Sequence, residues 1–356
     1  MAPVVRQLKR TEGIESLVCV TAQHRKMLDQ VLELFGIVPD IDLDLMRDDQ
    51  TLSQLSAAIF TSLDPVLKKL QPDWVLVQGD TTTVAITALL AYYHRIKVGH
   101  VEAGLRTHDK WQPFPEEINR RVAGVAADLH FAPTTWARNN LLREGVPEQQ
   151  IALTGNPVID ALQTVSSQPA PKEVQSLLER LNISPGGKRL VLVTAHRREN
   201  FGQPMVDICS ALKELASRGD LEIVYPVHLN PNVQEPVHRL LENRPHITLL
   251  PPLDYRPLVH LMKQATLVLT DSGGIQEEAP AFGVPVLVLR EVTERPEGVE
   301  AGTLKLVGTN ADRIVSQSKL LLDDPVEYAK MAKASNPFGD GHAAERIVQA
   351  LISSSG

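Results

Sequence analysis

The segment from Leu267 to Leu289 constrains the fold of this chain more than any other. An apolar run of β type, Leu267–Thr270, ends at Asp271-Ser272-Gly273-Gly274; a short helical segment follows, and a second apolar run begins after Gly283-Val284-Pro285. This order predicts a strand, a turn, a helix and a parallel strand. Small residues at a helix start leave backbone N–H groups accessible, so an anion can bind at the positive end of the helix dipole. The segment therefore predicts a site for the phosphates of a nucleotide diphosphate.

Apolar runs alternate with amphipathic helical segments along the whole chain. This alternation predicts an α/β fold with parallel sheets and helices on both faces. The stretch Ser166–Pro171, rich in Ser and Pro, is the best linker candidate and divides the chain into two Rossmann-like domains, 1–165 and 172–335. We predict strands at 16–20, 73–78, 96–101, 129–132, 151–154, 189–194, 221–225 and 247–250, and helices at 24–35, 51–70, 115–127, 134–144, 203–217, 231–241 and 257–264.

Composition excludes several classes of protein. With 356 residues and 43% hydrophobic side chains, the chain is long enough for two globular domains. A formal net charge of −7 argues against general nucleic-acid binding. No run approaches the roughly 20 apolar residues of a membrane span, and the first residues lack the apolar core of a signal peptide, so we expect a cytoplasmic protein without a membrane partner. Cys19 and Cys209 lie in apolar surroundings and are predicted to be buried, reduced thiols.

Polar residues that directly follow the predicted strands are the candidates for the site, because ligands of parallel sheets bind beyond the carboxyl ends of the strands. This rule selects Asp80 and Glu102 in the first domain, and His196, His228 and the Asp271–Gly274 turn in the second. Two facing domains would form a cleft with carboxylates on one wall and an anion site on the other.

Each acid also has a plainer interpretation. Asp80 could cap the helix that begins at Thr81, and Glu116 with its neighbour could be ordinary first-turn partners of a helix dipole. Glu102 ends a buried strand, where an unpaired carboxylate is costly, so it is expected to be functional or paired with Arg106. No HExxH motif or Cys/His cluster with metal-ligand spacing occurs, and we predict no metal site.

A series of sequence blocks in one order makes the chain recognisable over essentially its whole length. It resembles the non-hydrolysing UDP-N-acetylglucosamine 2-epimerases, whose fold is the two-Rossmann arrangement also found in glycosyltransferases of the B type. The resemblance implies that a C-terminal helix, about 342–353, completes the first domain. The matching blocks are QGDTTT (78–83), HVEAGLRT (100–107), PEEINRR (115–121), GNPVIDAL (155–162), HRREN (196–200), YPVHLNPNV (225–233), TDSGGIQEEAP (270–280) and TERPE (293–297).

The resemblance implies interconversion of UDP-GlcNAc and UDP-ManNAc without a cofactor. Family members eliminate UDP across C1–C2 to form 2-acetamidoglucal and then add UDP back, a route that would serve surface-polysaccharide synthesis. A homodimer is implied as well. By motif, the residues carried over as catalytic are Asp80, Glu102, Glu116 and His196. Those carried over as substrate-binding are Arg197, Leu253, Leu258, Ser272, Gly273, Gly274, Glu278 and Arg295.

Three positions depart from the residues that family members can carry. Leu253 and Leu258 stand in the uracil loop where relatives can carry a polar and an aromatic residue. Some relatives are activated by a second UDP-GlcNAc; Gln23, Arg197 and His228 match that region, but Lys26 replaces a glutamine of regulated members. The sequence leaves allosteric activation open.

The largest departure from the family lies at the first residues. Family members open with a strand and an arginine-bearing GTRPEA-type turn before the segment that here begins at Met1, and we expect the lack of that strand to leave two unpaired strand edges. Our hypothesis is that Met1 is an internal methionine of a longer protein. The competing functions are a catalytically impaired protein that binds nucleotide sugars, a UDP-sugar glycosyltransferase, and a hydrolysing epimerase.

Overall fold

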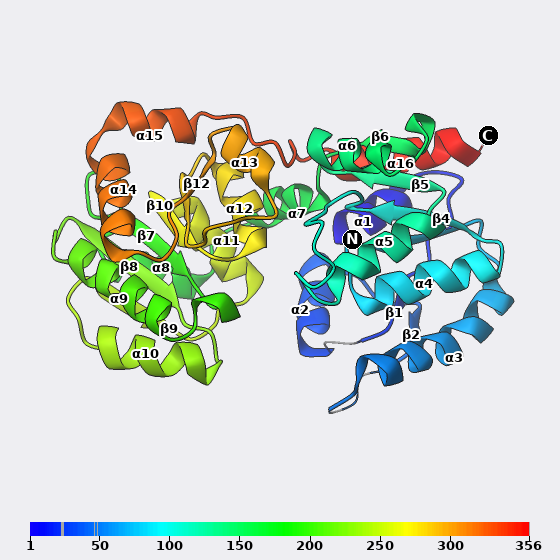
Figure 1. Ribbon diagram of the computed structural model, residues 1–356, viewed down its shortest axis with the longest axis horizontal. Helices are drawn as coiled ribbons and strands as arrows, with labels where there is room; N and C mark the ends of the chain where they lie inside the picture. The colour runs from blue at the N-terminus through cyan, green and yellow to red at the C-terminus, as the bar shows by residue number, and fades with distance from the viewer. Residues whose placement is uncertain (23–24, 46, 48, 356) are drawn as a thin grey trace. The chain divides into compact units, whose positions relative to one another are not determined.

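The computed structural model describes residues 1–22, 25–45, 47 and 49–355. The chain forms two compact units: unit 1 contains Met1–Ala161 and Phe338–Gly356, and unit 2 contains Leu162–Pro337 (Figure 1). Each unit is built on a parallel sheet, and the predicted α/β class is confirmed.

The sheet of unit 1 has four parallel strands in the order β3-β4-β5-β6. In the part of the chain that the structure describes, β1 and β2 form a separate two-stranded parallel sheet. The strands are β1 (Cys19–Val20), β2 (Ile41–Asp42), β3 (Trp74–Gln78), β4 (Lys97–Val101), β5 (Leu129–Ala132) and β6 (Ile151–Leu153). The helices are α1 (Ala2–Arg10), α2 (Arg25–Phe35), α3 (Leu52–Leu70), α4 (Thr82–Tyr93), α5 (Glu116–Ala126), α6 (Thr135–Arg143), the 3-10 turn η1 (Glu148–Gln150), α7 (Pro157–Ser166), which continues into unit 2, and α16 (Ala343–Ser355).

The first and last helices of the described chain pack together in unit 1. Val4 and Leu8 of α1 share a buried cluster with Ile347 and Val348 of α16 and with Phe131 of β5. The backbone N–H groups of residues 343 and 344, at the start of α16, donate to the carboxylate of Asp160 in α7. The C-terminal helix is thus part of the core of unit 1.

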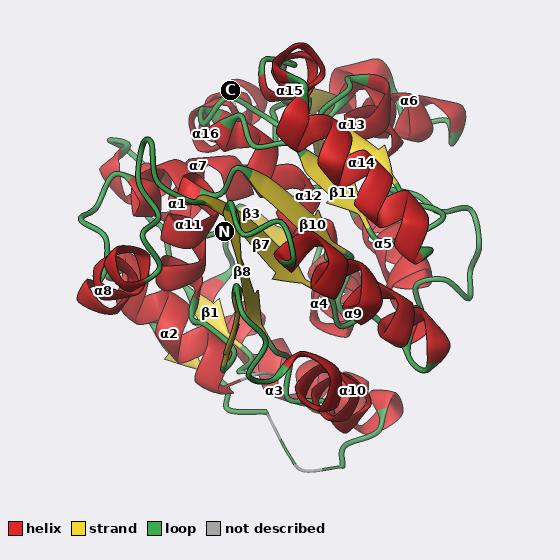
Figure 2. Cartoon of the chain, turned by 90° about the vertical axis from the view of Figure 1, so that its left-hand side faces the viewer, coloured by secondary structure: helices red, strands yellow, loops and turns green. Residues whose placement is uncertain are grey.

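The sheet of unit 2 has six parallel strands in the order β12-β11-β10-β7-β8-β9, and Figure 2 shows β10, β7 and β8 side by side. The strands are β7 (Arg189–Thr194), β8 (Leu221–Pro226), β9 (Ile247–Leu250), β10 (Leu267–Thr270), β11 (Val286–Val288) and β12 (Leu304–Leu306). The helical segments are α8 (Lys172–Arg180), η2 (Arg198–Asn200), α9 (Gln203–Ala216), α10 (Pro231–Leu241), α11 (Tyr255–Gln264), α12 (Gly273–Glu278), η3 (Ala279–Phe282), α13 (Pro296–Glu300), α14 (Ala311–Asp323) and α15 (Pro325–Ala332).

Alternating side chains of β7 fill two cores in unit 2. Val191 and Val193 pack against α9, α10 and α14 on one face, whereas Leu190 and Leu192 pack against α8 and α11 on the other. Period-2 alternation between two apolar faces is what a strand covered on both sides requires.

The cysteine prediction holds for one residue of two. Cys209 is a buried free thiol in the core beneath α9, but Cys19 is a free thiol on the surface. The apolar neighbours of Cys19 in sequence misled the prediction, because β1 is a two-residue strand whose residues alternate between an exposed and a buried side. None of the helices in the described part of the chain is both long and apolar enough to cross a membrane.

Candidate active site

The order of the strands in unit 2 defines where a ligand would bind. The chain adds β8 and β9 on one side of β7, and then β10, β11 and β12 on its other side. β7 and β10 are therefore the neighbours at which the strand order reverses, and open α/β sheets bind ligands beyond the carboxyl ends of the strands at that point. Thr194 and Thr270 lie opposite each other at these ends, with their hydroxyl oxygens 2.6 Å apart.

The predicted phosphate turn follows β10 directly. Ser272 is the N-cap residue of α12, and its hydroxyl makes no capping hydrogen bond. A Cβ added to Gly274 would meet no atom within 4 Å beyond the adjoining residues and the backbone of α12 itself, and the residue is exposed. The first turn of α12 thus presents accessible backbone N–H groups of the kind that bind phosphate.

Arg295 lies over the same turn. A Cβ added to Gly273 would come 2.7 Å from an amino nitrogen of its guanidinium, so only glycine fits beneath it without a shift. The Nε of Arg295 donates to Oε1 of the buried Glu277 at 2.6 Å, which fixes the guanidinium beside the start of α12. A cation in this position adds to the attraction of the helix start for anions.

Glu278, the predicted ribose ligand, is buried at the end of α12. Its Oε1 accepts a hydrogen bond from the hydroxyl of Tyr255 at 2.7 Å. Burial raises the pKa of Glu278 to about 7, although the Tyr255 hydrogen bond lowers it. Leu253 and Leu258, the predicted uracil-loop residues, are half-buried and pack against the core cluster beside α8 and α11.

The loop after β7 is tied to the turn after β10 by one carboxylate. Oδ2 of Asp271 accepts hydrogen bonds from the backbone N–H of His196 at 2.8 Å and of Arg197 at 2.9 Å, and from the side-chain amide of Asn200 at 2.9 Å. The His196 ring stacks on the ring of His228, with centroids 5.2 Å apart. Unit 2 therefore brings the predicted His196, Arg197, His228 and phosphate turn together.

In unit 1, the predicted acid Asp80 follows β3 and pairs with Arg120 of α5. The helix that follows is capped by Thr81, whose side chain accepts from the backbone of residue 84, so the interpretation of Asp80 as the cap is wrong. Arg120 also contacts Glu117, at 3.3 Å, and Glu117 is fully buried.

Glu117 organises the loop that precedes α5. Its carboxylate accepts the backbone N–H groups of Thr107 at 3.1 Å and His108 at 3.2 Å. Glu117 is therefore more than a dipole partner at a helix start. Its neighbour Glu116, the predicted catalytic acid, is the first residue of α5 and is half-buried.

Glu102 has an uncommon backbone conformation. Its φ is +66°, in the left-handed region that non-glycine residues rarely adopt, and such strain often occurs at functional sites. The side chain is half-buried, and the amide of Gln78 lies 3.4 Å from its Oε2.

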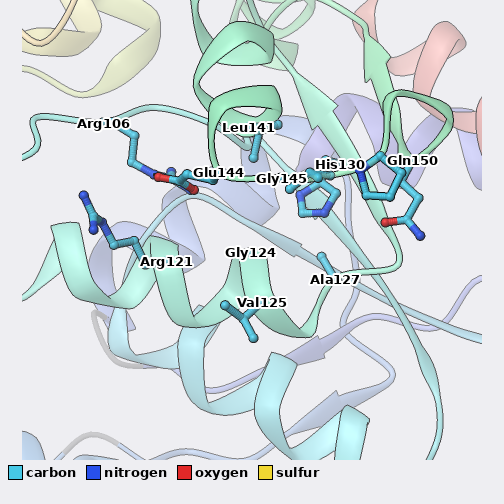
Figure 3. Close-up of a pocket in the computed structure, with 12 residues that line it drawn as sticks. Arg106, Arg121, Gly124, Val125, Ala127, His130, Leu141, Glu144, Gly145 and Gln150 are labelled. Carbon is cyan, nitrogen blue, oxygen red and sulfur yellow. The ribbon is translucent and has the colours of Figure 1, made fainter.

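The predicted pairing of Glu102 with Arg106 is wrong. Arg106 is buried and makes a two-point ion pair with Glu144, the residue directly after α6, with both N···O distances at 2.8 Å. Figure 3 shows the two side chains pointing toward each other beside a cavity of about 450 Å³. None of the predicted site residues lines that cavity.

Several residues of the site were not singled out in the sequence. Arg120, Glu117, Tyr255 and Asn200 each hold a predicted site residue or its loop through a contact to a distant element. In the sequence, these four residues could have been noticed only because they lie in a matching block or just before a predicted helix. The predicted regulatory residue Gln23 lies outside the described residues, and the side chain of Lys26 is not described. Within the described residues, no group of three or more His, Cys, Asp and Glu side chains could hold a metal ion.

Comparison with known proteins identifies the family of this chain. A family model described as UDP-N-acetylglucosamine 2-epimerase matches residues 6–352. The UDP-N-acetylglucosamine 2-epimerase of Yersinia pestis is 54% identical over 99% of this chain and 94% of its own length. Among solved structures, the UDP-GlcNAc 2-epimerase from Neisseria meningitidis bound to UDP-GlcNAc has a TM-score of 0.91 at 46% identity, covering 99% of this chain and 96% of that one. The Methanocaldococcus jannaschii enzyme in complex with UDP-GlcNAc and UDP has a TM-score of 0.80 at 33% identity, covering 100% and 96%. This chain belongs to the UDP-N-acetylglucosamine 2-epimerase family.

Proposed function

We propose that this chain interconverts UDP-GlcNAc and UDP-ManNAc by inverting C2 of the sugar. The observation that carries the proposal is the strand reversal of unit 2, where the Ser272–Gly274 turn, Arg295 and the His196 loop surround one anion-binding helix start. Glu278 is the last residue of the helix that begins at this turn, in a position from which it could bind the ribose of the same nucleotide.

The chemistry of the substrate dictates an elimination. The C2 proton is not acidic enough to be removed alone, so its loss accompanies departure of UDP: the C1–O and C2–H bonds break and the C1=C2 double bond of 2-acetamidoglucal forms. Return of UDP to C1 and of a proton to the opposite face of C2 gives the epimer. This route requires groups that stabilise the leaving diphosphate and groups that move one proton.

The predicted site residues divide between these two tasks. In this proposal Asp80, Glu102 and Glu116 supply the carboxylates that move the proton. The residues that bind the diphosphate are Ser272, Gly273, Gly274, Arg295, His196 and Arg197. Glu278 binds the ribose, and Leu253 and Leu258 line the uracil pocket. By motif alone, Gln23, Arg197 and His228 match the region where a second UDP-GlcNAc activates some relatives. No cofactor takes part.

Incubation with UDP-GlcNAc in deuterated water, followed by NMR, tests the activity. We expect UDP-ManNAc with deuterium at C2, because the proton is lost and regained at that carbon. Glu102→Gln should slow both epimerisation and exchange by about 100-fold or more, the usual contribution of a general acid or base. Free ManNAc with UDP would instead indicate a hydrolysing enzyme, and UDP binding without exchange at C2 would indicate a binding protein.

We propose further that the chain works as a homodimer through α4 and α5, which lie side by side in unit 1 (Figure 1). Large apolar side chains are exposed on these helices: Tyr92 and Tyr93 at the end of α4, and Ile118 and Val125 on α5. Ile118 and Val125 are two helical turns apart and share a face. Large apolar side chains exposed on neighbouring helices are typical of an interface between subunits.

Val125→Glu tests this interface. Val125 is 90% exposed, so the substitution should leave the fold of unit 1 intact but place a charge in the dimer contact. Light scattering should then give a mass near 39.2 kDa in place of twice that value. Val38→Glu, at a 77% exposed valine outside these helices, is the matched control and should remain dimeric. Dimeric Val125→Glu would contradict the proposal.

A cytoplasmic location is also part of the proposal. The exposed free thiol of Cys19 and the unpaired Cys209 suit a reducing compartment, where such thiols persist.

A further inference from the structure

Asp271 is a fully buried carboxylate with one oxygen in use and one free for other contacts. Its Oδ2 accepts all three hydrogen bonds from the His196–Asn200 loop. Its Oδ1 is buried and has no hydrogen-bond partner, and this oxygen lies 3.6 Å from Nδ1 of His196.

A buried carboxylate oxygen without a partner is costly, so the group that faces it matters. The three hydrogen bonds to Oδ2 hold the carboxylate and the loop rigidly, which leaves Oδ1 directed toward the imidazole of His196. A proton on Nδ1 would be attracted to this oxygen, whereas the lone pair of an unprotonated Nδ1 would be repelled. The neutral ring then carries its proton on Nδ1 and keeps Nε2 free.

Opposing charges act on His196 from three elements. Burial lowers the pKa of His196, and the neighbouring Arg197 and His228 lower it further, whereas the charge of Asp271 raises it. The His228 ring comes from the loop after β8 and lies almost parallel to the His196 ring, with 14° between the planes. Asp271 is thus the one group among these that favours a protonated His196.

We propose that Asp271 is the positioning residue of His196: it fixes the Nδ1–H tautomer of the free protein and stabilises the imidazolium that forms when a diphosphate binds beside it. The second half of the proposal rests on the proposed function, because it takes the ligand of the turn to be UDP. In the imidazolium form, Nδ1–H faces Asp271 and Nε2–H donates to a phosphate oxygen, and the added proton is taken up from solvent. The carboxylate thereby links the loop after β7 to the charge on the departing nucleotide.

NMR of the ¹⁵N-labelled imidazoles tests the first half without any ligand or turnover. His196→Gln assigns the signal. We expect the wild-type ring to show the Nδ1–H tautomer, and Asp271→Asn to lower the pKa of His196 because the facing negative charge is removed. An Nε2–H tautomer in the wild-type protein, or an unchanged pKa in folded Asp271→Asn, would overturn the proposal. The tautomer of His196 in the wild-type protein tests the first half of the proposal even if Asp271→Asn does not fold.

Asn200→Ala is the matched control for a purely structural role. It removes one hydrogen bond to Oδ2 but keeps the charge, so it should lower the melting temperature and leave the pKa of His196 in place. Titration with UDP tests the second half: the pKa of His196 should rise on binding in the wild-type protein and rise less in Asp271→Asn. If UDP does not bind at all, the proposed function fails. The NMR measurement of the His196 tautomer still tests the first half of the proposal, because it needs no ligand.

Discussion

Glu278→Gln is expected to stabilise the free protein above neutral pH while it weakens the binding of UDP. Glu278 is 5% exposed, and burial raises its pKa from the ordinary value of 4.5 to about 7. Above pH 7 the native protein must keep a charged carboxylate buried next to Glu277, and glutamine of the same shape avoids that cost. The same charge is what two ribose hydroxyls would bind, so its loss costs affinity.

The sign of the pH dependence follows from the two pKa values. Between pH 4.5 and about 7 the native state binds more protons at Glu278 than the unfolded state does, so the free energy of unfolding falls as the pH rises through this window. Glutamine has no such dependence. The stability difference in favour of Glu278→Gln should therefore grow with pH and reach on the order of 3 kcal/mol at pH 8.

Urea denaturation at pH 5, 6, 7 and 8, with calorimetric titration of UDP at pH 8, measures both effects. Tyr255→Phe is the matched control: it removes the one side-chain hydrogen bond that lowers the pKa of Glu278, so the pH window of the wild-type protein should move upward. A Glu278→Gln protein that is less stable than wild type at pH 8 would show that Glu278 is not held as a costly buried charge.

The fold was predictable from the sequence because its signals are local. The strand predicted at 129–132 is β5, and the helix predicted at 231–241 is α10. An apolar run predicts the strand and a 3.6-residue period predicts the helix, and neither signal depends on residues far away in the sequence. No helix is predicted at 157–166, where α7 lies, although proline at the first helical position is typical of a helix start. The two-residue strand β2 has no period at all.

The contacts within the site were not predictable in the same way. Asp80 and Arg120 are 40 positions apart, Arg106 and Glu144 are 38 apart, and Asp271 and Asn200 are 71 apart. The acids can be selected because they directly follow predicted strands. The local sequence does not indicate which arginine, from which helix, contacts each acid. The sequence suggests Arg106 as the partner of Glu102 because the two residues are close in the chain. In the structure Arg106 pairs instead with Glu144, the residue directly after α6.

Gly274→Val is expected to abolish UDP binding without loss of stability. The Cβ would enter open space, because no atom beyond the adjoining residues and the backbone of α12 itself lies within 4 Å of it, and Gly274 is a helical residue without a positive φ, so we expect little strain in the free protein. A bound phosphate, however, must approach the backbone N–H groups of the first turn of α12 at hydrogen-bond distance, where the valine methyl groups would stand. Loss of one or two charge-assisted hydrogen bonds corresponds to a decrease in affinity of about 100-fold or more.

Calorimetric titration of UDP and thermal melting of the same samples separate these effects. Gly274→Ala places a single methyl group at the phosphate site and should weaken binding less than valine does, while it raises the free energy of unfolding by about 0.5–1 kcal/mol, since alanine replaces glycine in a helix. Gly124→Ala, in α5 of unit 1, is the control: its Cβ would make an ordinary 3.6 Å contact with Arg106, so it should give a similar change in stability and no change in UDP affinity. Tight binding of UDP to a folded Gly274→Val protein would mean that the phosphates lie elsewhere, because no nucleotide could reach the start of α12 past that side chain.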